Sequence, residues 1–162
     1  MKLVVQELVI HAPAAEIYRM LVEPRLFVQW MATEATLEPV VGGTVRWTHA
    51  NGDTCSGRYL ELVPHRRVVF TYGWERAEVG IPPGSTTVEI VLVPHGPGST
   101  RLKLVHHGLA DPAADAHHHG WHHYLGRLRA LAHGEPPGPD PLADRRVPSF
   151  TGRISSDRKP AT

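Results

Sequence analysis

Cysteine is almost absent from the sequence, which holds a single one, Cys55. An intrachain disulfide and a cysteine-based metal motif are therefore both excluded. Excess charge is also lacking, because 17 Lys and Arg residues stand against 16 Asp and Glu residues. This balance favours binding to neither nucleic acid nor an anionic membrane. A chain without disulfides suits a reducing compartment, so we expect a cytoplasmic protein with neither of these partners.

Long hydrophobic runs are missing as well. The most apolar stretch near the start, MKLVVQELVIHAP, is interrupted by Gln6 and Glu7. It is too short and too polar for a signal peptide or a membrane span, and we expect neither. The length of 162 residues and the hydrophobic fraction of 41% instead fit one globular domain of ordinary size.

The periodicity of apolar residues predicts both helices and strands. Residues 3–11 are typical of a strand, and residues 13–22 predict a short helix that Pro24 ends. The period then changes to two, and the NGD turn at 51–53 indicates a hairpin. Further strands follow up to residue 108, and a helix is predicted from about Pro112 to His133. Tight turns between successive strands favour an antiparallel sheet and an α+β class.

Three stretches resemble the START/SRPBCC superfamily, whose helix-grip fold is also that of the major birch-pollen allergen. IHAPAAEIYRMLVEPRLFVQWM is similar to its first strand and following helices. GGTVRW…NGD…SGRYLELVPHRRVVFTYGW is similar to its central strands. TTVEIVLVPHGPGSTRLKLVHHGL…GWHHYLGRLRAL is similar to its last strands and closing helix. Together they most resemble the branch of homologues of the heat-shock-protein-90 ATPase activator.

The resemblance implies a helix-grip fold. In it a curved antiparallel β-sheet wraps around a long C-terminal helix, two short helices follow the first strand, and a cavity lies between sheet and helix. We assign residues 1–134 to this domain and residues 135–162 to a Pro-rich tail that is either mobile or docked. Exposed sheet edges and the tail also suggest a homodimer, as a hypothesis.

The segment HHGLADPAADAHHHGWHHYLGRL, residues 106–128, contains seven of the 12 histidines. On a helical wheel His117 falls inside the apolar arc, His118 and His122 fall at its border, and His119 and His123 face solvent. Two HxxxH pairs result, 118/122 and 119/123. Neither has the glutamate of a HExxH motif or an evident third ligand, so we predict no metal site and no cofactor.

His106 and His117 point toward the space between sheet and helix, on this interpretation. They are either hydrogen-bonded residues of the core or of the cavity rim, or polar groups that hold a ligand or transfer protons. We expect the histidines in turns and at element ends to be solvated, namely His49, His65, His95 and His133. Cys55 is expected to be a small buried filler.

Aromatic residues are the other candidates for the cavity lining, each with an alternative interpretation as plain core. An indole has one donor that prefers a partner, and a tyrosine hydroxyl can bond to a ligand. The candidate ligand-binding residues are Phe27, Trp30, Trp47, Tyr59, Tyr72, Trp74, His106, His117 and Trp121.

Three functions remain open at this point. The first is binding of a small hydrophobic or aromatic molecule, with no chemistry assigned. The second is a cyclase or hydratase acting on a polyketide-like substrate, with His106, His117 or a tyrosine moving protons. The third is a chaperone-associated role in the stress response, which only the resemblance implies. Fold alone does not choose among them.

Overall fold

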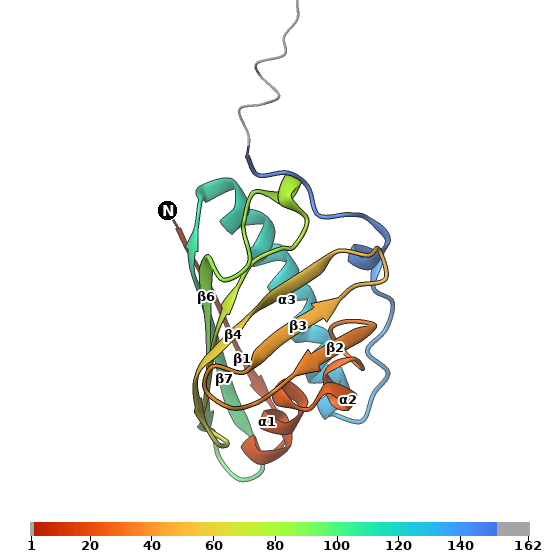
Figure 1. Cartoon of the computed structure of the whole chain (residues 1–162). Helices are drawn as coiled ribbons and strands as arrows, with labels where there is room; N and C mark the ends of the chain where they lie inside the picture. The colour runs from red at the N-terminus through yellow and green to blue at the C-terminus, as the bar shows by residue number, and fades with distance from the viewer. Residues whose placement is uncertain (1, 152–162) are drawn as a thin grey trace, which may run out of the picture.

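Seven strands form one curved antiparallel sheet in a computed structural model that describes residues 2–151 (Figure 1). The strand order is β1-β7-β6-β5-β4-β3-β2. The strands are β1 (Lys2–Ile10), β2 (Glu34–Leu37), β3 (Thr44–Thr48), β4 (Thr54–Val63), β5 (Arg67–Tyr72), β6 (Thr86–Pro94) and β7 (Thr100–Leu109). The α-helices are α1 (Ala14–Val22), α2 (Pro24–Phe27) and α3 (Asp111–Ala132), and the 3-10 turns are η1 (Ala77–Val79) and η2 (Pro141–Asp144).

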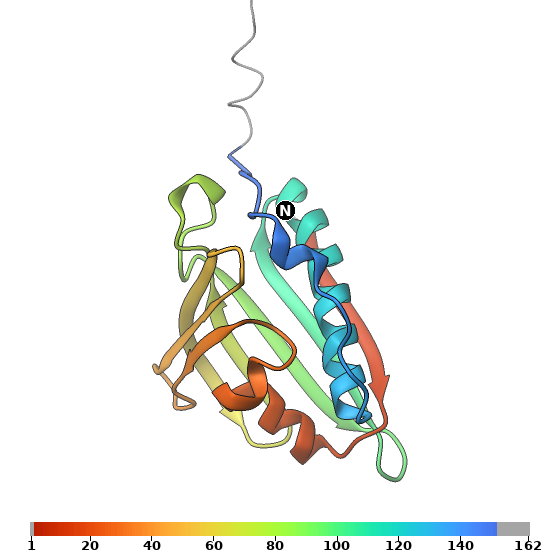
Figure 2. The ribbon, with the colours of Figure 1, turned by 90° about the vertical axis from the view of Figure 1, so that its right-hand side faces the viewer.

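The long helix α3 lies against the concave face of the sheet, with α1 and α2 at one end of it (Figures 1 and 2). This arrangement confirms the predicted α+β class and helix-grip architecture. The apolar stripe of α3 is buried as the periodicity predicted, through Trp121, Tyr124, Leu125 and Leu128. Burial of this stripe, more than helix propensity, holds the helix on the sheet.

Alternation along β6 and β7 builds the centre of the core. Val88 stands opposite His106 and Ile90 stands opposite Leu104 in the antiparallel register. All four side chains are buried, on the face that the period of two predicted. His106 therefore occupies a core position of the sheet, and its two ring nitrogens both need partners there.

The edge strand β2 was not predicted. It pairs with β3 from Glu34 to Leu37, and Leu37 is its one fully buried residue. A four-residue edge strand with a single buried side chain gives no alternation that sequence reasoning can detect.

Part of the Pro-rich tail lies on the domain. Residues 134–139 run back beside α3, and residues 140–151, which we call the strap, continue toward the η1 loop (Figure 2). The Phe150 amide donates to the Val79 carbonyl at 2.9 Å, and Phe150 and Val147 pack against the core. The predicted tail also includes residues 152–162, which lie outside the described residues.

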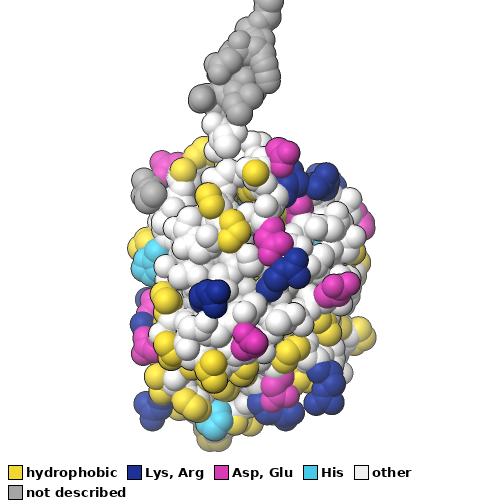
Figure 3. Space-filling model, viewed as in Figure 1, with side chains coloured by type: hydrophobic (Ala, Val, Ile, Leu, Met, Phe, Trp, Pro, Cys, Tyr) yellow, Lys and Arg dark blue, Asp and Glu magenta, His cyan; other side chains and the backbone are white. Residues whose placement is uncertain are grey.

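Within residues 2–151 no helix is long and apolar enough to cross a membrane. On the face shown in Figure 3, basic and acidic side chains are interspersed, in keeping with the formal net charge of +1. The charge of this face is therefore mixed rather than of one sign.

Gly57 of β4 allows a close approach between strands. A Cβ at this position would lie 1.8 Å from the Thr71 carbonyl oxygen of β5. We expect Gly57→Ala to lower the free energy of unfolding by about 2 kcal/mol, because the backbones must separate. Gly126 of α3 has no atom within 4 Å of its Cβ position, so Gly126→Ala should stabilise by about 1 kcal/mol. Urea unfolding of both variants tests this, and equal effects would contradict it.

Candidate functional site

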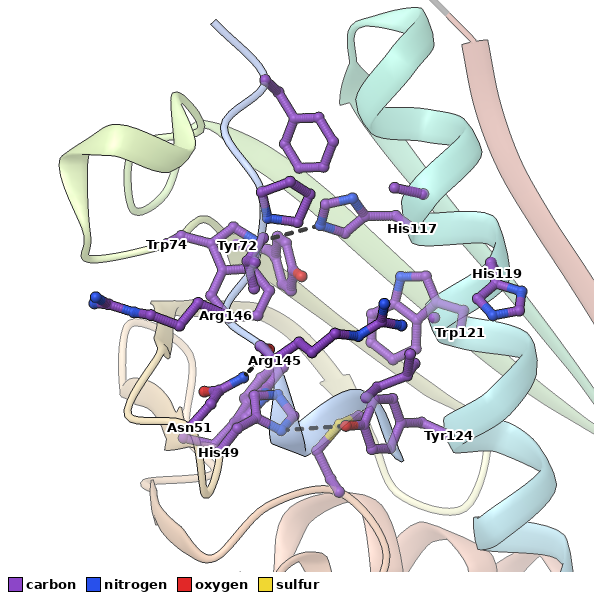
Figure 4. Close-up of a pocket in the computed structure, with 18 of the residues that line it drawn as sticks. His49, Asn51, Tyr72, Trp74, His117, His119, Trp121, Tyr124, Arg145 and Arg146 are labelled. Carbon is purple, nitrogen blue, oxygen red and sulfur yellow. Dashed lines mark hydrogen bonds between the residues drawn. The ribbon is translucent and has the colours of Figure 1, made fainter. Parts of the chain in front are cut away.

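A cavity of about 660 Å³ lies between the sheet, α3 and the strap (Figure 4). This volume is within the range of roughly 300–1,000 Å³ that is usual for small-molecule sites. Its lining includes six Trp, Tyr and Phe side chains, which come from four parts of the fold. Trp47 comes from β3, Tyr72 and Trp74 from β5 and the loop after it, Trp121 and Tyr124 from α3, and Phe150 from the strap.

Three indole groups around this cavity each donate their N–H to a histidine. Trp47 and Trp74 line one wall of the cavity, and Trp121 lines the other. A buried indole N–H without an acceptor carries a desolvation cost, and an imidazole nitrogen removes it. The pairs are Trp47–His49 at 3.2 Å, Trp74–His117 at 3.2 Å and Trp121–His106 at 3.0 Å.

Hydrogen bonds fix the protonation state of His106. Its Nδ1 accepts from Trp121, so the ring proton is on Nε2, which donates to the Thr86 hydroxyl at 2.9 Å. That hydroxyl in turn donates to the Tyr72 carbonyl at 2.9 Å. Burial, and then the neighbouring His117, lower the pKa of His106 to about 2. His106 is therefore neutral at physiological pH, with both nitrogens in use.

His117 is also a neutral imidazole, but its ring proton is on Nδ1 instead of Nε2. Its Nε2 accepts from Trp74, so Nδ1 carries the proton and donates to the Ala113 carbonyl at 2.8 Å, one helical turn earlier. Burial lowers its pKa, although the bond to Ala113 opposes this. Of the two interpretations left open by the sequence, the geometry favours hydrogen-bonded histidines over proton-transfer groups, with His106 in the core and His117 at the cavity.

His49 was predicted to be solvated, and this prediction is wrong. The residue is 7% exposed and lines the cavity, and burial lowers its pKa. Its Nε2 accepts from Trp47, and Nδ1 faces the Tyr124 hydroxyl at 3.4 Å. The missed signal was the alternation of Val45 and Trp47, which one further step extends to His49.

The start of the strap is held by Asp140. Its carboxylate accepts hydrogen bonds from the Tyr124 hydroxyl at 2.9 Å and from Nε2 of His123 at 2.9 Å. Burial, and then the charge of Asp140, raise the pKa of Tyr124. The Tyr124 hydroxyl is thus a donor to the strap rather than a proton source for a ligand.

The middle of the strap is held by Asp53, which follows the NGD turn into β4. Asp53 is 1% exposed and accepts from Nε of Arg76 at 2.8 Å and from the Val147 amide at 2.6 Å. Burial favours the neutral acid, but the bonds from Arg76 and Val147 outweigh it and lower the pKa of Asp53. We call Asp53, Arg76 and Val147 the latch. Sequence reasoning treated Asp53 as a turn residue only.

The candidate residues from the sequence divide into three groups. Trp47, Tyr72, Trp74, His117 and Trp121 line the cavity. Phe27 and Trp30 lie instead around a separate space of about 10 Å³, together with Trp47 and Trp121. Tyr59 and His106 are buried in the core and are not part of the lining, and His106 lies behind Trp121. Cys55 is fully buried, as expected of a filler.

In the HxxxH pairs, His118, His119 and His122 are exposed, and His119 also lines the cavity. His123 was predicted to face solvent, and this is wrong, because it is partly buried beside Asp140. His118 faces Gln6 of β1, and His123 faces Asp140. No group of three His, Cys, Asp or Glu side chains suited to a metal ion occurs within residues 2–151.

Comparison with known proteins identifies a family that shares this architecture. Residues 11–133 match the model of the family described as Activator of Hsp90 ATPase homolog 1-like protein. The chain belongs to this family. The matched region includes strands β2 to β7 and α3, whereas β1 and the strap lie outside it. No curated protein matches the chain.

Several solved structures share this fold. An AHSA1-like protein from Rhizobium etli is 39% identical over 90% of this chain and 91% of its own, with a TM-score of 0.68. A protein from Mesorhizobium loti is 21% identical over 82% of this chain and 98% of its own, with a TM-score of 0.74. The Aha1 dimer from Colwellia psychrerythraea is 19% identical over 82% and 96%, with a TM-score of 0.69. The last two likenesses show the fold alone, so homodimerisation of this chain stays a prediction.

The pKa of His106 predicts how stability depends on pH. The ordinary histidine pKa is about 6.5, so between that value and about 2 the unfolded chain binds more protons than the folded one. Stability should therefore fall as the pH drops from 7 to 5, by up to about 1.4 kcal/mol per pH unit for this group. In His106→Gln, which keeps a donor and an acceptor, the slope should be shallower. The exposed control His122→Gln should keep the wild-type slope in urea unfolding, and identical slopes in all three proteins would contradict the assignment.

Loss of the latch should release the strap. Asp53→Asn removes the charge that pairs with Arg76, and breaking a buried pair from one side is strongly destabilising. We expect amide hydrogen exchange of residues 145–151 to accelerate at least about tenfold. Glu75→Gln breaks the more exposed pair with Arg46 and serves as the control. Unchanged exchange in Asp53→Asn would show that the latch does not hold the strap.

Proposed function

We propose that this protein binds a small hydrophobic or aromatic molecule in the cavity between the sheet and α3. On this proposal it acts in the cytoplasm, uses no cofactor and performs no chemistry on the ligand. The observation that supports it most is the cavity of about 660 Å³ with its aromatic side chains, bordered by sheet, helix and strap. Apolar enclosure with few polar groups is the usual composition of small-molecule sites.

The state of the histidines supports binding over catalysis. A general acid or base needs a pKa near the working pH and a nitrogen free to face the substrate. His106 and His117 have lowered pKa values, and both nitrogens of each ring are engaged by the protein. The cyclase or hydratase alternative would therefore need other residues.

The family name suggests a chaperone-associated role as a further alternative. Ligand binding depends on the residues that line the cavity. Activation of a chaperone depends on an exposed surface and needs no cavity. We prefer ligand binding because it gives the cavity and the strap a common role.

Filling the cavity from α3 tests the proposal. Gly120 lines the cavity, and a Cβ there would meet no atom within 4 Å. Gly120→Met should keep the fold, since Met is a better helix former than Gly, while its side chain occupies ligand space. Gly126→Met is the matched control, because its Cβ position is equally open but lies outside the lining.

The measurement is native mass spectrometry of untagged protein, purified without a metal column, before and after mild denaturation. We expect wild type and Gly126→Met to retain a small organic molecule that Gly120→Met lacks. Titration with an aromatic probe such as 1-anilinonaphthalene-8-sulfonate should give the same order, with at least about tenfold weaker binding in Gly120→Met. A wild-type protein that is empty and does not bind the probe would overturn the proposal.

A further inference from the structure

The polar groups around the cavity bond almost entirely to one another. The indole N–H groups of Trp47, Trp74 and Trp121 all donate to histidines. The Tyr124 hydroxyl donates to Asp140. Asn51 donates to the Arg145 carbonyl and accepts from the Asp53 amide. A ligand therefore meets mainly ring faces and apolar edges beside these residues, because the donors named here are already in use.

The acidic groups near the cavity are occupied in the same way. Asp115 lines the cavity and is paired with Lys2 at 2.9 Å. Asp140 accepts from Tyr124 and His123, as described above. An incoming cation would have to break one of these contacts before it gained a carboxylate partner.

The carboxylate of the latch also has partners already. Asp53 is paired with Arg76 at 2.8 Å, and Nε of Arg146 lies 3.9 Å from the same carboxylate. Of the two arginines that the strap adds to the lining, Arg146 thus already has an acidic neighbour.

Arg145 differs from all these groups. Within residues 2–151 its guanidinium has no ion pair and no hydrogen bond to another side chain. Figure 4 shows its side chain extending from the strap across the cavity toward Trp121 and Tyr124, whereas Arg146 points the other way. A guanidinium keeps its charge at every physiological pH and presents a planar fork of donors that matches a carboxylate.

From this geometry we infer that the preferred ligand is a planar aromatic carboxylic acid, whose ring lies among the tryptophans and whose carboxylate pairs with Arg145. The inference rests on the proposed binding function and adds its chemical class. It also means that the charge that selects the ligand belongs to the strap. The strap lies beyond the region 11–133 that the family model matches. Relatives that share the sheet and α3 but differ in this segment would then differ in the charge of their ligands.

Three probes of one shape test the charge directly by isothermal titration calorimetry: 2-naphthoate, 2-naphthamide and 2-naphthylmethylammonium. For the full-length protein we expect naphthoate to bind at least about tenfold more tightly than naphthamide, and the ammonium compound most weakly. Arg145→Gln should abolish the preference for naphthoate, because it weakens naphthoate binding far more than naphthamide binding. Arg145→Lys should retain part of the preference, since it keeps the charge and loses the fork.

Two controls separate this inference from the binding function itself. Arg129→Gln alters an exposed arginine of α3 that is not part of the lining, and it should change no affinity. Gly120→Met should weaken all three probes alike. Equal affinity for naphthoate and naphthamide in wild type, or tightest binding of the ammonium compound, would overturn the inference and leave ligand binding standing. Failure of all three to bind would also overturn it, and native mass spectrometry then decides the binding function separately.

Discussion

The cavity depends on one constraint: three buried indole N–H groups each need a hydrogen-bond acceptor. Trp47, Trp74 and Trp121 are large buried side chains between sheet and helix, and each has one N–H that needs an acceptor. The chain supplies an imidazole for each of them, from the end of β3, from β7 and from α3. This pairing allows large aromatic walls to stand around an open volume without unsatisfied donors.

The same pairing determines what the cavity can do. An imidazole that accepts from an indole must be neutral, and its second nitrogen is left as a donor to Thr86 or to the Ala113 carbonyl. The histidines are thereby removed from acid–base chemistry, and the site is left aromatic and largely apolar. The arginines of the lining both come from the strap, which the latch and Asp140 hold in place. The family scaffold thus provides the enclosure, and the segment after it provides the guanidinium.

Sequence patterns predicted the scaffold well, because burial repeats along it. The period of two in β6 and β7 and the stripe on α3 placed Val88, Ile90, His106 and Trp121 inside. The patterns could not predict contacts between distant residues that follow no period. Asp53 looked like a turn residue because its partners, Arg76 and Val147, are 23 and 94 positions away. Arg145 lies in a Pro-rich stretch with no periodicity, so only the folded strap brings it to the cavity.

The central claim, that the histidines around the cavity are neutral hydrogen-bond partners rather than catalytic groups, is open to direct measurement. Two-dimensional ¹H–¹⁵N NMR spectra of the imidazole rings distinguish both neutral tautomers and the protonated form. We predict that His106 carries its proton on Nε2 and His117 on Nδ1, and that both remain so as the pH is lowered from 7 to 5. Protonation of either ring near the ordinary histidine pKa, about 6.5, would contradict the account.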